Sequence, residues 1–311
     1  MVDLILFGDC KETLKQFPRG SAQMCVTSPP YYGLRDYGGE ANQIGQEETP
    51  EEFVNNLVEV FREVRDVLKD DGVLWLNIGD SYYNYRPGTG GLPKQTVSRT
   101  SQDLPTQCNR RANKLDGLKE KDLIGIPWML AFALRADGWY LRQDIIWHKP
   151  NPMPESVKDR CTKSHEYIFL LSKNKKYYYD NEAIKEPVKQ DWGTRNRDAG
   201  KYHNPGTGLQ PHSGLTKSYE RKNKRDVWSI TNKPYKGAHF ACFPPDLIEP
   251  CILAGSRKGD VILDPFMGSG TTAMVAKQHD RSYIGCELNE QYGSLIQKRL
   301  KAIPTKLPFD M

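Results

Sequence analysis

Two short strings of residues in this chain carry side chains that could do chemistry. The first runs from Asp260 to Thr272 and reads DVILDPFMGSGTT, a short apolar strand that ends at Asp264 and a glycine-containing turn that leads into a helix. Gly268 and Gly270 permit positive φ angles and a close approach of the backbone to a ligand. The amide groups at the start of the following helix favour an anionic group, such as a carboxylate.

An acid lies at the end of the next strand. Glu287 ends the segment SYIGCE, which follows the turn after one helix. An acid at this place in a β-α-β unit suits the hydroxyl groups of a ribose. A tight structural turn alone would explain the glycines, but it would not explain the complete string together with the acid. The string is not a phosphate-binding P-loop, because no lysine follows Gly270.

The second string, TSPPYY, runs from Thr27 to Tyr32 and follows another predicted strand. Its two prolines forbid both continued strand pairing and a helix interior, so the Ser28 hydroxyl and nearby carbonyl groups project past the strand end. Such a site can accept hydrogen bonds from an amino group and can stack a planar ring on Tyr31. On spacing alone, a proline-rich connector with surface tyrosines is the favoured interpretation.

The composition excludes several classes of protein. Aromatic residues make up 10% of the 311 residues, which excludes a disordered chain, and the longest nearly uncharged apolar stretch, 123–134, is too short to span a membrane. Seven cysteines without a CxxC pair argue against a disulfide framework or a zinc ribbon. The N-terminus lacks the basic region of a signal peptide. We therefore expect a cytoplasmic protein, without a metal or a membrane partner.

Positive charge gathers in one segment of the chain. The net charge is only +5, but residues 173–236 hold 15 Lys and Arg against 7 Asp and Glu, a net charge of +8. This distribution suggests a surface that faces a polyanion, although a solvated loop region explains the charge alone equally well. The candidate polyanion-binding residues are Arg195, Arg197, Arg221, Lys222, Lys224 and Arg225.

The elements that must position these residues alternate between strands and helices. Predicted strands cover residues 2–7, 23–27, 73–78, 140–147, 167–172, 261–263 and 283–286, and predicted helices cover 11–17, 48–68, 127–136, 245–254, 271–279 and 290–300. Helix 48–68 is the clearest, with Thr49 and Glu52 as a capping box. Asp71 and Gly72 predict a turn into the following strand. The alternation predicts an α/β fold with a mostly parallel sheet and helices on both faces.

Together, the two strings resemble the motifs of the S-adenosylmethionine-dependent DNA amino-methyltransferases, which methylate N4 of cytosine or N6 of adenine. That family carries a D/N/S-P-P-Y/F/W catalytic motif and an F-x-G-x-G cofactor motif. Here Ser28–Tyr31 precedes Phe266–Gly270 by more than 230 residues, an order that resembles the β group of the family. Further segments with a family resemblance are Phe7–Cys10, Ile146–Asn151, His165–Ser172 and Gly237–Gly255.

The resemblance implies a Rossmann-like methyltransferase fold with an inserted target-recognition region. Residues 1–80 and 123–172 would form the catalytic half, and residues 237–311 the cofactor-binding half. Residues 81–122 would form a variable loop. The basic segment 173–236 would be the target-recognition region, because the β group places that region between the two motifs.

The resemblance also implies a role for each matching residue, with S-adenosyl-L-methionine as the cofactor. The Ser28 hydroxyl and the Pro29 carbonyl would accept hydrogen bonds from the target amine, Pro30 would fix the backbone, and Tyr31 would stack on the base. The implied cofactor-binding residues are Asp264 for the amino group, Thr271 and Thr272 for the carboxylate, Glu287 for the ribose, and Phe266, Gly268, Gly270, Asp9, Phe240 and Asp246. Asp9 and Asp246 could instead be helix caps, and Trp147 and Lys149 could wall the base pocket.

The expected substrate is a base flipped out of double-stranded DNA. Within the family a serine at the first motif position is more often associated with N4 of cytosine, so Ser28 favours cytosine, with N6 of adenine as the alternative. The resemblance also implies a cognate restriction endonuclease that acts separately as a partner, and the cytoplasm of a bacterial or phage-infected bacterial cell as the location. More distant alternatives are an RNA or protein-glutamine methyltransferase, which the basic segment and the motif order disfavour, and a DNA-binding module without activity, which leaves both strings unexplained.

Overall fold

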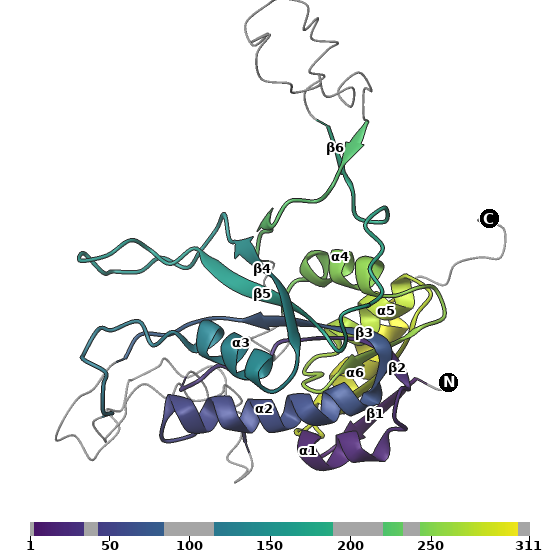
Figure 1. The fold of residues 1–311 in the computed structure, drawn as a ribbon, viewed down its shortest axis with the longest axis horizontal. Helices are drawn as coiled ribbons and strands as arrows, with labels where there is room; N and C mark the ends of the chain where they lie inside the picture. Colours follow the sequence, from purple (N-terminus) through teal and green to yellow (C-terminus); the bar gives the residue numbers. More distant parts are fainter. Residues whose placement is uncertain (1–2, 34–42, 84–114, 189–219, 233–242, 304–311) are drawn as a thin grey trace, which may run out of the picture.

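The computed structural model describes residues 3–33, 43–83, 115–188, 220–232 and 243–303, and Arg195, Arg197 and Phe240 lie outside these ranges. Figure 1 shows a central sheet with helices on both faces and a two-stranded arm that projects from it. The elements in chain order are β1 (Leu4–Phe7), α1 (Cys10–Thr13), the 3-10 helix η1 (Leu14–Gln16), β2 (Ala22–Thr27), α2 (Pro50–Val67), β3 (Leu68–Ile78), α3 (Ile126–Ala136), β4 (Tyr140–His148), β5 (His165–Ser172), β6 (Glu186–Pro187), β7 (Arg221–Lys222), β8 (Val227–Ser229), α4 (Pro245–Gly255), β9 (Val261–Asp264), α5 (Thr271–Gln278), β10 (Ser282–Glu287) and α6 (Tyr292–Lys301).

The described strands of the main sheet lie in the order β1-β10-β9-β2-β3-β5-β4-β8. Strand β5 runs antiparallel to both of its neighbours, β3 and β4, and the other adjacent pairs are parallel. The predicted mostly parallel sheet is therefore confirmed. Parallel strands place their carboxyl ends at one edge of the sheet, which is where ligands bind in open α/β folds.

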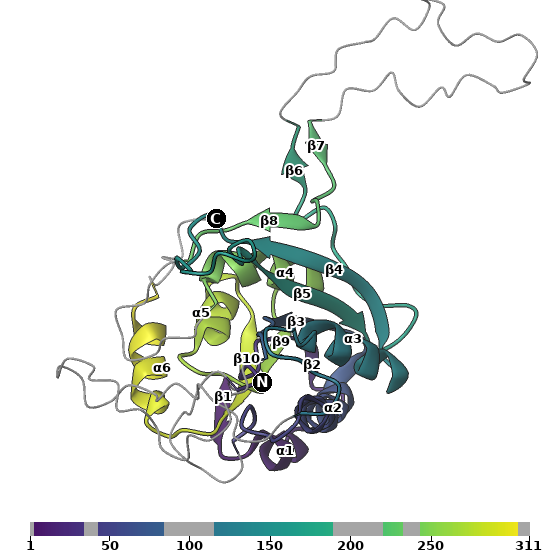
Figure 2. The same ribbon diagram turned by 90° about the vertical axis from the view of Figure 1, so that its left-hand side faces the viewer.

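Helices cover both faces of the sheet, as predicted (Figure 2). Successive side chains of a strand point to opposite faces, and β3 shows this directly. Leu74 and Leu76 are buried in the apolar layer beneath α1, α2 and α3. Trp75 is buried in the opposite layer, beneath α4, α5 and α6. This two-sided burial explains the nearly continuous apolar sequence of the central strands.

Helix α2 begins as its sequence predicts. The Thr49 hydroxyl accepts a hydrogen bond from the Glu52 amide at 3.1 Å, and the Glu52 carboxylate accepts one from the Thr49 amide at 3.3 Å. Pro50 occupies the first turn, where its missing N–H costs no hydrogen bond. The apolar stripe of the helix is buried against the sheet and includes Phe53, Leu57, Val60, Phe61 and Val64.

The predicted turn at Asp71 and Gly72 is wrong. Strand β3 begins at Leu68, immediately after α2, and continues to Ile78. Its first part bulges against β2, because Ala22 pairs with Leu68 but Met24 pairs with Val73. A Cβ on Gly72 would lie 2.8 Å from the Lys69 carbonyl oxygen, so the tight backbone of the bulge requires the glycine. The Asp-Gly pair thus marks an irregular strand rather than a loop.

The basic segment 173–236 contributes to two structures among its described residues. Strands β6 and β7 pair antiparallel as the stem of an arm that stands out from the sheet beyond β8 (Figure 2). Strand β8 itself joins the main sheet beside β4. The arm is therefore attached directly to the sheet rather than through a separate domain.

Two general findings concern the described residues. None of their helices is both long and apolar enough to cross a membrane. They also contain no group of three or more His, Cys, Asp or Glu side chains that could hold a metal ion.

Candidate active site

The two strings predicted to carry chemistry meet at the carboxyl edge of the sheet. Strands β9 and β2 are neighbours, so Asp264 at the end of β9 lies beside Thr27 at the end of β2. The Thr27 hydroxyl donates a hydrogen bond of 2.6 Å to Asp264 Oδ1. Residues 237 positions apart in the chain are thus joined at one point of the fold.

Asp264 binds its surroundings with both carboxylate oxygens. Oδ1 also accepts a bond from the Phe266 amide at 3.0 Å, and Oδ2 accepts one from the Thr272 hydroxyl at 2.6 Å. Burial raises the pKa of Asp264 to about 6, although these three donors each favour the ionised form. In this structure Asp264 therefore fastens the glycine turn to the end of β2. Its expected contact with the amino group of the cofactor stays a prediction.

The glycine turn has the backbone that its sequence predicts. Gly268 and Gly270 have φ angles of 53° and 80°, in the left-handed region that glycine tolerates. A Cβ on Gly270 would lie 2.9 Å from Ile296 Cγ2 of α6. Glycine is thus required at position 270 both by its φ angle and by the close approach of α6.

Glu287 ends β10 next to this turn. Its Oε2 accepts a hydrogen bond from the Gly268 amide at 2.7 Å, and its Oε1 accepts one from the Asn289 amide at 2.9 Å. Burial raises the pKa of Glu287 to about 7, and the nearby Asp264 carboxylate acts in the same direction. Each carboxylate oxygen has a second lone pair, so the predicted hydrogen bonds to ribose hydroxyls are compatible with these contacts.

Helix α6 supplies a residue that the sequence analysis missed. Arg299 donates hydrogen bonds to the Thr271 hydroxyl at 2.9 Å and to the Ser269 hydroxyl. The Thr272 hydroxyl is completely buried and donates to Asp264. Both threonines predicted to bind a carboxylate thus also hold the turn in place. A basic residue on a regular helix 29 positions after the turn gives no sequence signal of this contact.

The remaining predicted cofactor residues differ in their surroundings. Asp9 caps α1, where its carboxylate accepts a bond from the Lys11 amide at 2.9 Å, so the helix-cap alternative is confirmed for this residue. Asp246 is exposed in the first turn of α4. Phe266 is half-buried against the apolar layer beneath α1, α2 and α3.

The catalytic string follows β2 as predicted. Pro29 is buried, whereas Ser28, Pro30 and Tyr31 are half-buried. Within the part of the chain that the structure describes, the Ser28 hydroxyl makes no hydrogen bond. An acceptor at the carboxyl edge that no donor among these residues occupies suits an incoming amino group.

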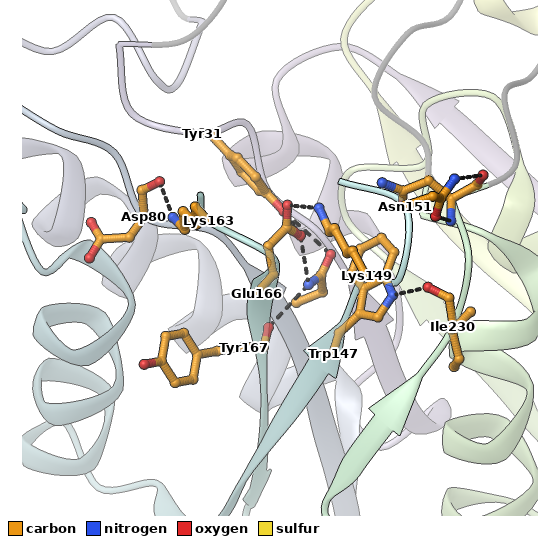
Figure 3. A network of polar contacts seen from close by, with 11 residues as sticks. Tyr31, Asp80, Trp147, Lys149, Asn151, Lys163, Glu166, Tyr167 and Ile230 are labelled. Carbon is orange, nitrogen blue, oxygen red and sulfur yellow. Dashed lines mark hydrogen bonds and ion pairs between the residues drawn. The ribbon is translucent and has the colours of Figure 1, made fainter. Parts of the chain in front are cut away.

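Tyr31 contacts a carboxylate that the sequence analysis also missed (Figure 3). Its hydroxyl donates a hydrogen bond of 2.7 Å to Glu166 Oε2, near the start of β5. Asn77 of β3 donates to the same oxygen at 3.4 Å. Glu166 lies in the segment His165–Ser172, which resembles the family, but the sequence analysis gave Glu166 no role of its own.

The loop between β4 and β5 contacts the base of the 81–122 loop. The Lys163 ammonium donates to the Asp80 carbonyl oxygen, and burial lowers the pKa of Lys163. Arg160 lies over the Tyr82 ring, 3.9 Å from its centroid. The Asp80 carboxylate in turn accepts bonds from the amides at the start of α3. The β4–β5 loop and the residues around the start of the 81–122 loop are therefore in contact.

Comparison with known proteins then decides the family. The model of the DNA methylase family N6_N4_Mtase matches residues 22–298. The chain belongs to the DNA methylase family. This confirms the predicted resemblance and, with it, a DNA methyltransferase that uses S-adenosylmethionine, the methyl donor of the family.

Two curated relatives of the methylase are Type II methyltransferases. M.Cfr9I of Citrobacter freundii is 47% identical over 300 residues, which cover 96% of this chain and 88% of the relative. M.SmaI of Serratia marcescens is 48% identical over 301 residues, which cover 95% of this chain and 90% of the relative.

Solved structures confirm the predicted methyltransferase fold. One is TTHA0409 of Thermus thermophilus, a putative DNA modification methylase complexed with S-adenosyl-L-methionine. Its TM-score is 0.60 at 23% sequence identity, and the match covers 97% of this chain and 95% of the TTHA0409 chain. The other is PvuII DNA methyltransferase (cytosine-N4-specific), with a TM-score of 0.62 at 18% sequence identity. The match covers 99% of this chain and 89% of the PvuII methyltransferase chain.

Four of the six residues predicted to bind DNA are described by the structure: Arg221, Lys222, Lys224 and Arg225. They lie in the stem of the arm or directly after it. The Arg221 guanidinium donates to the Lys185 carbonyl oxygen at 3.0 Å, and Arg225 forms an ion pair with Glu186 at 3.1 Å. The Lys224 ammonium lies 4.9 Å from the centroid of the Trp228 ring. These residues bind the two strands of the stem to each other, so their contact with DNA stays a prediction.

Proposed function

We propose that this DNA methylase transfers a methyl group from S-adenosylmethionine to the exocyclic N4 amine of a cytosine that is flipped out of duplex DNA. The observation that carries the proposal is the Ser28 hydroxyl, which is half-buried at the end of β2 next to Tyr31. Within the family, a serine at this motif position is more often associated with N4 of cytosine than with N6 of adenine. The fold similarity to PvuII DNA methyltransferase, which is cytosine-N4-specific, is consistent with this choice.

The carboxyl edge of the sheet fits the cofactor. Gly268 and Gly270 have positive φ angles and carry no side chain, and they lie next to the backbone amides at the start of α5. Glu287 adds a carboxylate at the end of the adjacent strand, 8% exposed, which suits a ribose diol. Glu287 and the glycine turn are thus the residues that would hold the ribose and the methionine part.

The difficulty of the reaction lies in the acceptor amine. Its lone pair is delocalised into the aromatic ring, so the nitrogen is a poor nucleophile. The Ser28 hydroxyl and the Pro29 carbonyl accept hydrogen bonds from the two N–H groups and localise the lone pair toward the methyl group. Bound S-adenosylmethionine supplies an electrophilic methyl group on a sulfonium. Transfer of this methyl group would leave a neutral thioether, and the methylated nitrogen would give one of its protons to solvent.

Positioning and preorganised hydrogen bonds carry most of the rate in such a transfer. The bond of Thr27 to Asp264 supports this function, because it holds the residue before Ser28 against the cofactor turn. Unstacking the target base costs a few kcal/mol, and phosphate contacts of the basic segment 173–236 would offset that cost. This segment is our candidate target-recognition region.

Incubation with tritium-labelled cofactor tests the proposal against its rivals. Separate DNA, RNA and protein fractions are exposed to the enzyme, and the label is expected in duplex DNA alone. Label in RNA or protein would contradict a DNA substrate.

The Type II relatives also support a separate restriction endonuclease with the same recognition sequence as a partner. Cleavage of unmodified DNA and protection of enzyme-treated DNA would identify it.

A further inference from the structure

A carboxylate and an ammonium group face the catalytic string from the antiparallel part of the sheet. Glu166 of β5 pairs in register with Trp147 of β4, and Lys149 follows β4 directly. Glu166 and Lys149 form an ion pair, and their side chains are only 14% and 17% exposed. Figure 3 shows the pair between Tyr31 on one side and Trp147 on the other.

The contact with Tyr31 is built into the fold. The Tyr31 hydroxyl donates to Glu166 Oε2 at 2.7 Å. A Cβ on Gly79 would lie 2.7 Å from Tyr31 Cε2 and 3.3 Å from the Glu166 carboxyl carbon. The absence of a side chain at position 79 therefore makes the space in which the tyrosine ring and the carboxylate meet.

Further contacts link this pair to the end of the basic segment. The Lys149 ammonium lies 4.3 Å from the centroid of the Trp147 ring, a favourable cation–π distance. The Trp147 indole donates a hydrogen bond of 2.9 Å to the carbonyl oxygen of Ile230, directly after β8. A continuous series of contacts thus runs from Ile230 through Trp147, Lys149 and Glu166 to Tyr31.

We propose that Glu166 is a positioning residue for methyl transfer, which fixes the ring of Tyr31 beside Ser28 while Lys149 fixes Glu166. The inference rests on the proposed function, because it assigns Tyr31 to the target base. Removing one partner of a buried ion pair is destabilising, so the melting temperature of each variant is measured beside its kcat. A ring displaced by about 1 Å, however, can cost about 100-fold in rate.

The test is a double-mutant cycle of Glu166→Gln and Tyr31→Phe, measured as methyl transfer to duplex DNA. Tyr31→Phe removes the hydrogen bond, whereas Glu166→Gln replaces the charged acceptor with a neutral amide that no longer forms the ion pair with Lys149. For each single variant we expect kcat to fall by about 10- to 100-fold, with KM for DNA within about threefold of wild type. Because both changes act on the same contact, Glu166→Gln should cause little further loss in the Tyr31→Phe background. Asp137→Asn is the matched control, since Asp137 is 12% exposed and paired with Arg62 at 2.6 Å. It should retain wild-type kcat.

Three results would overturn the inference. These are an unchanged kcat in Glu166→Gln, an equal loss in both Tyr31 backgrounds, and a crystal structure of Glu166→Gln in which the Tyr31 ring has not moved. The crystal structure gives an answer even without activity. A wild-type enzyme that transfers no label to DNA would instead refute the proposed function, and N6-methyladenine as its product would refute only the choice of base.

Discussion

At the scale of single residues, the Ser28 hydroxyl has the most specific role. Its hydrogen bond from the target amine strengthens only as the base aligns with the methyl donor, so its loss should lower kcat more than binding. We predict that Ser28→Ala slows methyl transfer by roughly two to four orders of magnitude. Some activity should remain, because the Pro29 carbonyl still accepts one bond. Cofactor and DNA affinities should stay near wild type, and full activity would refute the role of the hydroxyl.

Glu287 should make the stability of the enzyme depend on pH. Its pKa is raised by burial from an ordinary value of 4.5 to about 7. A raised carboxyl pKa gives stability that is present below the ordinary value and is lost as the pH rises through about 7. Glu287→Gln cannot ionise and escapes this loss, so its melting temperature relative to wild type should increase from pH 5 to pH 8. A difference that does not change with pH would contradict a raised pKa.

At the scale of elements, the cofactor turn depends on the close approach of α6. We predict that Gly270→Leu abolishes S-adenosylmethionine binding in calorimetry, because the new side chain would overlap Ile296 and displace the turn. DNA affinity should stay mostly intact. Gly259→Leu is the matched control. Gly259 has nearly the same φ angle, 82°, but a Cβ there would have no atom within 4 Å. Unchanged cofactor affinity in Gly270→Leu would show that the turn is only structural.

Elements with local signals could be predicted from the sequence, whereas elements set by distant pairing could not. Helix α2 carries its start signal in Thr49 and Glu52, and the structure confirms it. The reversed direction of β5 has no local signal, because strand direction depends on the whole sheet. The Asp71–Gly72 pair indicated a turn because a bulge needs the same conformational freedom as a turn.

The same distinction holds for the site. The two strings were recognised because each gathers its chemistry within a few residues. Glu166 and Arg299 were missed because their partners, Tyr31 and Thr271, lie 135 and 28 positions away. Asp264 was recognised, but its bonds to Thr27 and Thr272 could not be foreseen, since only the adjacency of β9 and β2 creates the first of them.

At the scale of the whole molecule, the arm and the catalytic edge are parts of one structure. Strand β8 joins the arm to β4, which carries Trp147 and leads to Lys149. DNA held by the arm would therefore be placed relative to the catalytic string through the sheet itself. We therefore predict that the position of bound DNA depends on the packing of β8 against β4.

We predict that Arg221→Ala combined with Arg225→Ala weakens DNA binding and flattens its salt dependence. The log–log slope should fall by roughly one for each phosphate that is no longer neutralised. Arg62→Ala is the control, because Arg62 is an exposed, ion-paired arginine on α2, far along the chain from the arm. A wild-type slope in the double variant would mean that the arm stem does not contact the DNA backbone.

The product base of this DNA methylase, proposed here to be N4-methylcytosine, can be identified directly. Duplex DNA is incubated with the wild-type enzyme and S-adenosylmethionine, digested to nucleosides and analysed by mass spectrometry against synthetic standards. We expect N4-methylcytosine, formed only when the enzyme and the cofactor are both present. N6-methyladenine without N4-methylcytosine would contradict this expectation.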